Sequence, residues 1–295
     1  LSLLPNQGTE PSGSELSSSL LTDVWGSYVA FSAGPEGLTV QTDPVASLPC
    51  YYLQRGKLLL AFSHLEACPF PDEVQFRPEP DFIRAVLAYD RVQNGETGIR
   101  GVRELLAGQK LTLFRQGQTV TQVWDPRAFA ARPLRCTEAE AAAALREAAT
   151  EVIRAWSGHF RDIRIDLSGG FDSSAVAGLC AQVSQGDVRL LHHALASGDP
   201  SEAGYARAVA NHTGIPYTEI LLHPETSLPP PEAHPRSARP QRQFLGRDLT
   251  EPLARAGLGP VEATFTGQGG DHLFLATRSA RGVADYLLMR GIGPS

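Results

Sequence analysis

The sequence predicts a protein of two domains, in which an α+β layered domain is followed by an α/β domain with a parallel sheet. Three observations lead to this prediction: short β-type segments dominate the first part, strands alternate with helices in the second, and an aperiodic, proline-containing stretch at 124–136 separates them. The 295 residues, of which 42% are hydrophobic, can form two cores. We therefore place the first domain at residues 1–128 and the second at residues 137–295.

The first domain is expected to contain short strands and one helix. The strand segments are rich in apolar and β-branched residues between turn residues, and they lie at 24–31, 38–42, 48–53, 57–63 and 109–114. A helix is predicted from Pro80 to Tyr89 because its apolar residues recur at helical spacing. This mixture is typical of a layered α+β domain.

The second domain begins with a long helix. Thr137 and Glu140 have the spacing of a capping box, and an alanine-rich helix is predicted to run from there through Ala155. Two strands and a second helix follow, at residues 163–167, 188–194 and 203–213. The alternation indicates a parallel sheet, and open sheets of this kind bind ligands at the carboxyl ends of their strands. The proline-rich segment 224–242 is predicted to be a surface loop.

The strand that ends at Leu167 runs into Ser-Gly-Gly-Phe-Asp-Ser-Ser at residues 168–174 and then into a helix. Gly169 and Gly170 allow backbone N–H groups to surround an anion at the helix N-terminus. Hydroxyl donors are added by Ser168, Ser173 and Ser174. Asp172 suits a phosphate site only if it binds a Mg²⁺ that the phosphates also bind. The motif therefore predicts a phosphate-binding loop, because a simple helix cap would need only one of these residues.

This loop is neither of two common nucleotide motifs. A Walker A loop needs Gly-Lys-Ser/Thr, and a dinucleotide fingerprint needs a third glycine that is missing here. A second glycine-rich loop, Gly-Gln-Gly-Gly-Asp at 267–271, follows the predicted strand at 262–266. One carboxylate makes a poor magnesium site, whereas two carboxylates on adjacent loops, with phosphate oxygens and water, satisfy octahedral geometry.

The first loop resembles the PP-loop of the N-type ATP pyrophosphatases, which cut ATP between the α and β phosphates to form an adenylated intermediate. The second loop resembles the signature of the asparagine synthetase and β-lactam synthetase branch, in which a second aspartate completes the Mg²⁺ site. The resemblance implies ATP and Mg²⁺ as cofactors, with Asp172 and Asp271 as metal ligands. It also implies nucleotide contacts from both loops, including Gly267, Gly269 and Gly270. Adenine would lie against Leu167 and the backbone around Ala194, although apolar strand ends are also ordinary core.

The first domain resembles the glutaminase-type Ntn-hydrolase domain that precedes the PP-loop domain in asparagine synthetases. Such glutaminases use an N-terminal cysteine, but this chain opens with Leu1, and its first cysteine, Cys50, lies in an apolar run. We expect a scaffold role for this domain. Gln268 and His272 replace acids that are usual in asparagine synthetases. Without a source of ammonia, the attacking nucleophile is expected to come from the substrate itself.

One subfamily, the lasso peptide macrolactam synthetases (lasso cyclases), is similar over nearly the whole chain. The similar strings lie at 43–52, 97–105, 267–274 and 284–294. The resemblance implies that an Asp or Glu side chain of a core peptide is adenylated and that the peptide's N-terminal amine closes an isopeptide ring. It also implies three partners: the precursor peptide, a leader peptidase and a leader-binding protein. Another amide ligase of β-lactam or asparagine type, or a non-catalytic scaffold, is the alternative.

In this family the synthetase domain continues beyond the second aspartate loop and supplies Lys or Tyr/Glu groups that assist amide formation. The second domain is therefore expected to be incomplete at its C-terminus, and we assign no acid–base catalytic residue.

Composition excludes several classes of protein. The net charge of −6 and the pI of about 5.8 argue against nucleic-acid binding. No stretch approaches the roughly 18 apolar residues of a membrane span, and the N-terminus lacks a signal-peptide pattern. The four cysteines show no zinc-site spacing and are expected to be reduced thiols of a cytoplasmic protein.

Overall fold

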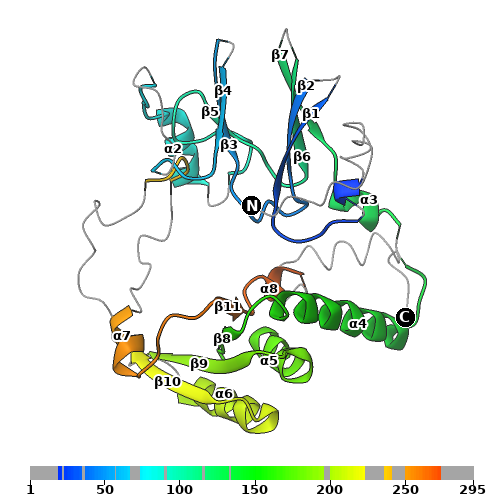
Figure 1. Ribbon diagram of the computed structural model, residues 1–295, viewed down its shortest axis with the longest axis vertical. Helices are drawn as coiled ribbons and strands as arrows, with labels where there is room; N and C mark the ends of the chain where they lie inside the picture. Colours follow the sequence, from blue (N-terminus) through cyan, green and yellow to red (C-terminus); the bar gives the residue numbers. More distant parts are fainter. Residues whose placement is uncertain are drawn as a thin grey trace, which may run out of the picture. The chain divides into compact units, whose positions relative to one another are not determined.

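The computed structural model describes residues 19–21, 23–34, 37–56, 58–66, 74–89, 92–114, 117–132, 134–195, 200–222, 236–240 and 250–273. The chain divides into two compact units (Figure 1). Unit 1 comprises Leu1–Leu134 and Pro229–Leu245, and unit 2 comprises Arg135–Leu228 and Gly246–Ser295. The second part of unit 1 thus comes from the middle of the predicted second domain.

Unit 1 contains two antiparallel sheets. The first has the order β1-β2-β6-β7, formed by Val29–Gly34, Gly37–Thr42, Gln109–Phe114 and Gly117–Gln122. The second has the order β4-β3-β5, formed by Leu58–Phe62, Tyr51–Arg55 and Val102–Glu104. The strand predicted at 24–31 begins only at Val29, because Gly26, with φ 113°, bends the chain before it. Strands β5 and β7 were not expected from the sequence.

Strand β3 connects the two cores of unit 1. Successive side chains of a strand point to opposite faces, so Tyr52 packs in a cluster with Val40 and Leu111, whereas Tyr51 packs in another with Phe62 and Ala238. Helix α2 covers Pro80–Ala88, one residue shorter than predicted, and buries Phe82. Unit 1 is therefore an α+β unit, as predicted, while its likeness to a glutaminase-type domain stays a prediction.

Residues 236–240 are packed within unit 1. The side chain of Ala238 is 1% exposed, and the Gly98 N–H donates to its carbonyl oxygen across 2.8 Å. The guanidinium of Arg239 donates to the carboxylate of Glu104 at 2.9 Å. The expectation of a surface loop is therefore wrong for Ala238 and Arg239, because a mostly buried ion pair and a backbone hydrogen bond hold them in place, whereas Arg236 is exposed. The other residues of this predicted loop, 224–235 and 241–242, lie outside the described residues.

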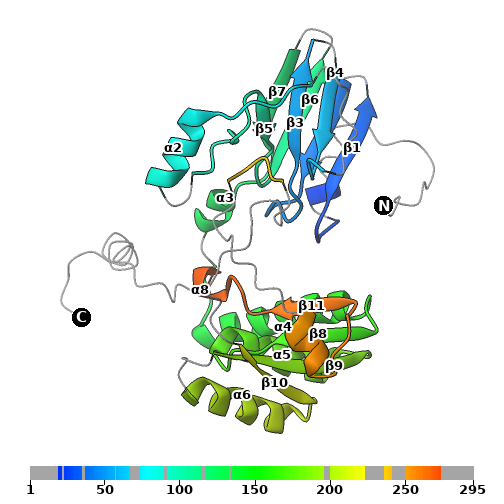
Figure 2. The same ribbon diagram turned by 90° about the vertical axis from the view of Figure 1, so that its left-hand side faces the viewer.

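Unit 2 is a parallel α/β unit, as predicted. Its sheet has the order β10-β9-β8-β11, formed by Tyr217–Leu222, Asp187–Leu195, Asp162–Asp166 and Ala263–Thr266. All three strand pairs are parallel. The helices are α4 (Glu138–Ser157), α5 (Phe171–Val183), α6 (Pro200–Thr213), α7 (Thr250–Arg255, labelled in Figure 1) and α8 (Gly270–Leu273). Helix α3 (Pro126–Ala130) precedes them in unit 1 (Figure 2).

The predicted capping box opens α4. The Glu140 N–H donates to Thr137 Oγ1 at 3.3 Å, and the Thr137 N–H donates to the Glu140 carboxylate at 2.8 Å. This reciprocal pairing satisfies two N–H groups that have no partner inside the helix. The carboxylate also accepts from the Thr137 hydroxyl, and these bonds lower the pKa of Glu140. The helix ends at Ser157, two residues beyond the predicted end.

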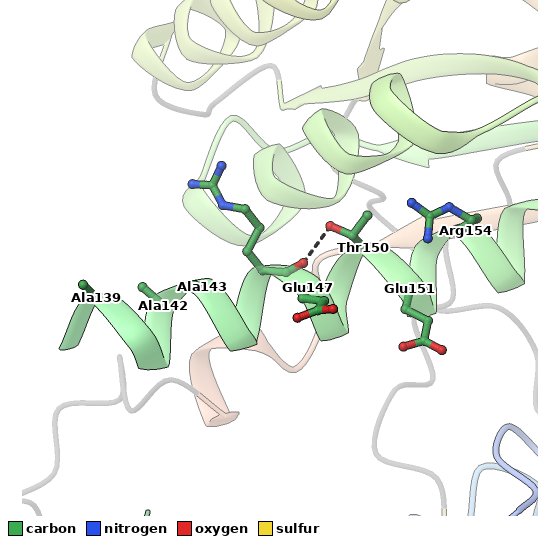
Figure 3. Close-up of a pocket in the computed structure, with 8 residues that line it drawn as sticks. Ala139, Ala142, Ala143, Glu147, Thr150, Glu151 and Arg154 are labelled. Atoms are coloured by element: carbon green, nitrogen blue, oxygen red, sulfur yellow. Dashed lines mark hydrogen bonds between the residues drawn. The ribbon is translucent and has the colours of Figure 1, made fainter. Parts of the chain in front are cut away.

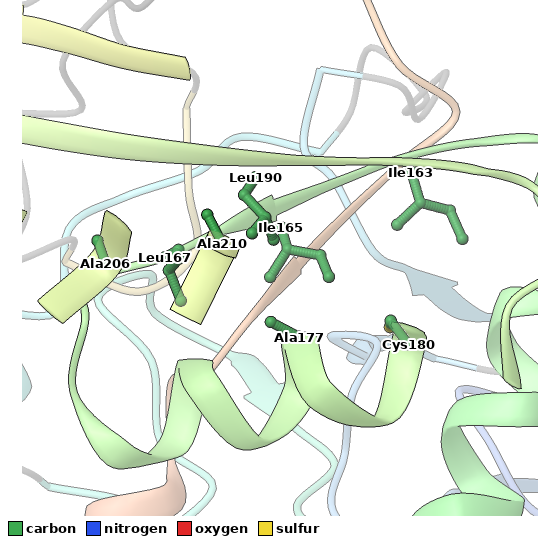
Figure 4. Packing of buried hydrophobic residues seen from close by; sticks show 8 residues of the cluster. All are labelled: Ile163, Ile165, Leu167, Ala177, Cys180, Leu190, Ala206 and Ala210. Carbon is green, nitrogen blue, oxygen red and sulfur yellow. The ribbon is translucent and has the colours of Figure 1, made fainter. Parts of the chain in front are cut away.

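The core of unit 2 lies between the sheet and helices α4, α5 and α6 (Figure 4). Ile163, Ile165 and Leu167 are at most 1% exposed and pack on small residues of the helices: Ala177, Cys180, Ala206 and Ala210. These small residues let the helices approach the strands closely. On the other face of the sheet, the apolar residues of β9 and β10 pack against Leu253 and Leu258. The sheet therefore provides a rigid base for the loops at its carboxyl edge.

None of the helices that the structure describes is both long enough and apolar enough to cross a membrane.

Candidate functional site

Two glycine-rich loops emerge side by side from the sheet of unit 2. The parallel pairing of β8 with β11 aligns Asp166 with Thr266, so that both strands end at the same level. Residues 167–170 follow the first strand and lead into α5, and residues 267–269 follow the second and lead into α8. The sequence motifs that are 100 residues apart are thereby brought to one edge of the sheet.

The serines of the first loop hold its shape. The Ser168 N–H donates to Ser173 Oγ at 3.2 Å, and the two hydroxyl oxygens of these residues lie 3.0 Å apart. The Gly170 N–H donates to Ser168 Oγ at 3.2 Å, and the Ser174 hydroxyl donates to the Gly170 carbonyl at 2.7 Å. Because Gly170 is the N-cap of α5, no side chain caps the first turn of this helix. The N-terminal end of α5 therefore faces the loop with its positive dipole end uncapped.

Gly169 is required by the close approach of α6. Its φ of +87° lies in the region that favours glycine. A Cβ atom at this position would lie 2.7 Å from the carbonyl oxygen of Glu202 and 2.9 Å from the backbone nitrogen of Ala206. Both of these atoms belong to the α6 backbone, which cannot give way as a flexible side chain can. The first loop, which leads into α5, is thus in close contact with the backbone of α6.

Gly267 and Gly270 bring the second loop onto the first turn of α5. A Cβ on Gly267 would lie 2.9 Å from the carbonyl carbon of Asp172 and from the Cα of Ser173. A Cβ on Gly270 would collide with the carboxyl group of Asp172. Neither glycine has a positive φ, so the close approach of two backbones is the reason for both. The contact places the carboxylate of Asp172 against the loop that carries Asp271.

A pocket of about 630 Å³ opens at this contact, and its size is typical of small-molecule sites. Its lining residues are Asp166, Ser168, Gly170, Phe171, Asp172, Ser173, Gly267, Gln268 and Asp271. The pocket combines the N-terminus of a helix with three carboxylates. Helix N-terminal N–H groups attract anions, whereas carboxylates attract metal ions and amines.

The predicted site residues divide into two groups. Six of them line the pocket: Ser168, Gly170, Asp172, Ser173, Gly267 and Asp271. The others do not line it: Leu167, Gly169 and Gly269 belong to the two loops, Ser174 and Gly270 to the first turns of α5 and α8, and Ala194 to β9. The side chain of Leu167 is in the core, and its N–H donates to the Leu191 carbonyl at 2.8 Å. Ala194 is half-buried in β9.

The carboxylates of Asp172 and Asp271 fit a magnesium ion that is bound together with a phosphate. Among the residues that the structure describes, no three Asp, Glu, His or Cys side chains gather closely enough to hold a metal ion on their own. Mg²⁺ commonly uses one or two carboxylates and completes its shell with water and substrate phosphates. Two carboxylates beside the N-terminus of α5 match that donor set.

Asp166 and Phe171 line the pocket but were not selected from the sequence. The signal for Asp166 is the alternation Ile-Arg-Ile-Asp-Leu at 163–167, which places the charged residues on the face opposite the core. Asp166 Oδ1 lies 3.6 Å from Arg164 Nε and 3.9 Å from His193 Nε2. For Phe171, which is 84% exposed, the sequence carries no comparable signal.

A larger groove, of about 750 Å³, runs along α4 (Figure 3). All of its lining residues belong to this one helix: Ala139, Ala142, Ala143, Arg146, Glu147, Thr150, Glu151 and Arg154. The Thr150 hydroxyl donates to the Arg146 carbonyl at 2.6 Å, a bond within the helix itself. The groove therefore lacks polar groups that converge from different elements, and the pocket between the two loops is the better candidate site.

Comparison with known proteins points to the same region. Residues 144–282, just under half of the chain, match the family model of asparagine synthase. No curated protein matches the chain. Among solved structures, the chain is similar to an NH3-dependent NAD synthetase from Campylobacter jejuni, with 22% identity over 26% of this chain and 34% of that one, at a TM-score of 0.24. It is also similar to an NMN synthetase from Francisella tularensis, with 18% identity over 26% and 35% and a TM-score of 0.25.

The chain thus spans about a third of the length of each of these two structures. The stretch that matches the family model contains both glycine-rich loops and both aspartates of the predicted metal site. In residues 144–282, the chain is therefore similar to the asparagine synthase family.

Proposed function

We propose that the protein is an ATP-dependent ligase that adenylates a carboxylate and then forms an amide. The observation that carries this proposal is the contact between the two glycine-rich loops, in which Gly267 and Gly270 lie against Asp172 and Ser173 at the N-terminus of α5. Such an arrangement suits a triphosphate with its metal ion. The match of residues 144–282 to the asparagine synthase family supports it.

Each group of the pocket has a role in this proposal. The first-turn N–H groups of α5 and the hydroxyls of Ser168 and Ser173 would bind phosphate oxygens of ATP. Asp172 and Asp271 would hold a Mg²⁺, and such an ion would supply positive charge to offset that of the phosphates. The pocket volume of about 630 Å³ is large enough for the reacting part of a nucleotide and a substrate carboxylate.

The proposed reaction has two steps. An oxygen of the substrate carboxylate attacks the α-phosphorus of ATP, the bond to the β-phosphate oxygen breaks, and pyrophosphate leaves. The nitrogen of an amine then attacks the acyl carbon, the bond to the AMP oxygen breaks, and the amine nitrogen loses a proton. The site would favour the second step by holding the amine beside the activated carbonyl.

For the substrate, we propose a core peptide whose Asp or Glu side chain is joined to its own N-terminal amine, as in lasso peptide cyclases. The similarity of the strings at 43–52 and 97–105 in unit 1, together with the Gly-Gln-Gly-Gly-Asp loop, supports this choice. Gln268, which stands where asparagine synthetases usually have an acid, lines the pocket. Unit 1 would be a scaffold, and a leader peptidase and a leader-binding protein would deliver the peptide.

The reaction can be tested with the full-length protein, ATP, Mg²⁺ and a core peptide that has a free N-terminal glycine and a downstream aspartate. We expect AMP, pyrophosphate and a peptide that has lost one water. An N-acetylated peptide should still support AMP formation but should form no ring. If free aspartate with ammonia, or a small β-amino acid, reacts faster than any peptide, the macrolactam assignment is wrong. If no carboxylate substrate yields AMP, the ligase assignment itself is wrong.

A further inference from the structure

Asp166 occupies a distinct position at the end of the central strand β8. The side chains of Ile163 and Ile165 face the helices, so Asp162, Arg164 and Asp166 lie on the other face of the sheet. The apolar cover of that face, from Leu253 and Leu258, packs on β9 and β10. The part of the face beside β8 and β11 is polar, and there Arg164 Nη2 donates to Thr264 Oγ1 at 3.1 Å.

One oxygen of the Asp166 carboxylate is buried on this face, near the guanidinium of Arg164 and the imidazole of His193, and has no hydrogen-bond partner among the described residues. Oδ1 is buried and lies 3.6 Å from Arg164 Nε and 3.9 Å from His193 Nε2. The side chain as a whole is 30% exposed, so its exposed surface belongs to the remaining atoms. Asp166 therefore borders the pocket between the two loops while its Oδ1 lies in an ion pair with Arg164. Arg164, which is 15% exposed, is itself held in place by Thr264.

We infer that Asp166 recognises the attacking amine of the acyl acceptor. This inference rests on the proposed function. The pocket has three carboxylates. Those of Asp172 and Asp271 lie where the two loops meet, and two carboxylates are enough to bind the metal ion. Asp166 is therefore not needed as a metal ligand. The amine is the reacting group that brings N–H donors together with, before it loses its proton, a positive charge. A partly buried carboxylate in an ion pair accepts such a donor with little further loss of side-chain freedom.

Amine recognition at Asp166 determines the fate of the activated carbonyl. When the amine attacks, the N–C bond forms, the C–O bond to AMP breaks, and an amide results. When water attacks instead, the same C–O bond breaks and the unchanged carboxylate returns with AMP. A carboxylate that holds the amine at the pocket favours the first outcome. The ligand class is therefore a primary amine, with the N-terminal amine of a peptide as the substrate.

The test compares Asp166→Asn with Asp162→Asn in the full-length protein. Asp162 lies on the same strand and the same face, is 29% exposed and faces Arg189 Nη2 at 3.2 Å, so it is a closely matched control. It lies at the other end of β8, about 13 Å away along the strand. With ATP and a saturating concentration of the core peptide, Asp166→Asn should keep AMP formation within about twofold, because the metal and phosphate groups remain. Ring formation should fall about tenfold, with a raised KM for the peptide and more linear peptide per AMP.

The control variant should resemble the wild-type protein in both measurements. Three results would overturn the inference: ring formation that Asp166→Asn leaves unchanged, AMP formation that falls in step with ring formation, or an equal defect in Asp162→Asn. The second of these would assign Asp166 to the nucleotide or the metal instead.

A binding measurement without ATP separates this inference from the proposed reaction. We expect the wild-type protein to bind the core peptide about tenfold more tightly with a free N-terminal amine than with an acetylated one, and Asp166→Asn to show no such preference. Equal binding of the two peptides to the wild-type protein would overturn the inference even if amides form. Preferential binding of the free amine by a protein that makes no AMP would overturn the ligase proposal and support amine recognition.

Discussion

Arg239 Nη1 donates a hydrogen bond to Glu104 Oε2 across 2.9 Å, although 135 positions separate the two residues. The side chains are 22% and 14% exposed, and Arg239 also donates to the carbonyl of Val92. The neighbouring Ala238 belongs to the same core cluster as Tyr51. The pair therefore anchors a segment from the second half of the sequence in unit 1. The chain crosses from one unit to the other three times, after residues 134, 228 and 245.

Breaking this pair should destabilise unit 1. Arg239→Gln leaves a mostly buried carboxylate without its counter-ion, which we expect to cost about 2–3 kcal/mol in the free energy of unfolding. A double-mutant cycle with Glu104→Gln, measured by urea unfolding, should give a coupling of about 1–2 kcal/mol. The pair Arg207–Glu219 is the control, since it has the same 2.9 Å separation but is 58% and 32% exposed. Its coupling should stay below about 1 kcal/mol, and equal couplings for the two pairs would contradict the anchoring role.

The destabilisation by Arg239→Gln should depend on pH. Burial raises the pKa of Glu104, and the charge and hydrogen bond of Arg239 oppose this effect. A carboxyl group whose pKa is raised in the folded state stabilises the fold in acid and loses that contribution as the pH rises through its pKa. Without Arg239 the pKa rises further, so the loss of unfolding free energy should be small near about pH 4 and grow towards about pH 7. Urea unfolding at several pH values measures this, and a loss that shrinks as the pH rises would contradict it.

Local patterns were sufficient to predict most of the elements that position the candidate site. The alternation of apolar and charged residues at 163–167 identifies β8 and its buried face. The loop after β8 is recognisable because its glycines, serines and aspartate each suit a different part of a phosphate-binding site. The capping box of Thr137 and Glu140 fixes the start of α4. These features depend on residues within one or two turns of each other, which is the range in which sequence patterns carry information.

Other features depend on contacts that no local pattern encodes. The anchoring of Arg239 by Glu104 joins distant segments, and nothing in the proline-rich sequence around Arg239 indicates it. The register of β8 with β11, which brings Asp172 against Gly270, follows from how two strands 100 residues apart pair in the sheet. Sequence motifs therefore predicted the two glycine-rich loops, while the role of each glycine in the contact became evident only from the structure.

Two glycine substitutions in unit 2 should have opposite effects, because α6 lies close to Gly169 whereas Gly178 has free space beside it. Gly169→Ala combines a strained φ with collisions against backbone atoms of α6, and we expect it to cost about 2–4 kcal/mol. Gly178 lies inside α5, and a Cβ there would meet nothing within 4 Å. Gly178→Ala should therefore stabilise the protein by about 0.5–1 kcal/mol. Thermal unfolding measures both changes, and a neutral Gly169→Ala would show that α6 does not press on the loop.

Thiol reactivity should distinguish the described cysteines. Burial raises the pKa of Cys50 to about 11, with a further contribution from the charge of Glu104, and burial alone raises that of Cys180 to about 11. Cys136 is exposed. Because the thiolate is the reactive form, a disulfide reagent at about pH 8 should modify Cys136 quickly and the two buried thiols slowly. The measurement uses a Cys68→Ser background, since Cys68 lies outside the described residues.

Cys50→Ala tests the scaffold role of unit 1. It should cost about 1–2 kcal/mol of stability and leave AMP formation unchanged, because Cys50 packs in a core cluster with Tyr52 and Leu105. Rapid labelling of Cys50, together with a glutamine hydrolysis that Cys50→Ala abolishes, would show that this thiol is a nucleophile and that unit 1 is not merely a scaffold.

The metal assignment makes the most direct prediction about the site. Asp172→Asn and Asp271→Asn keep the shape of each side chain but remove the charge that would bind Mg²⁺, so each should lower AMP formation by at least about 100-fold. Their thermal unfolding should remain close to that of the wild-type protein. Asp187→Asn is the matched control, because Asp187 is an exposed residue at the amino end of β9, at the edge of the sheet away from the loops. Raising the Mg²⁺ concentration should recover part of the lost activity in the two site variants, since a weakened ion site fills at higher concentration. Normal AMP formation in either site variant, with normal unfolding, would remove that aspartate from the metal site, whereas an equal loss in Asp187→Asn would show that the substitutions act through the sheet rather than through the pocket.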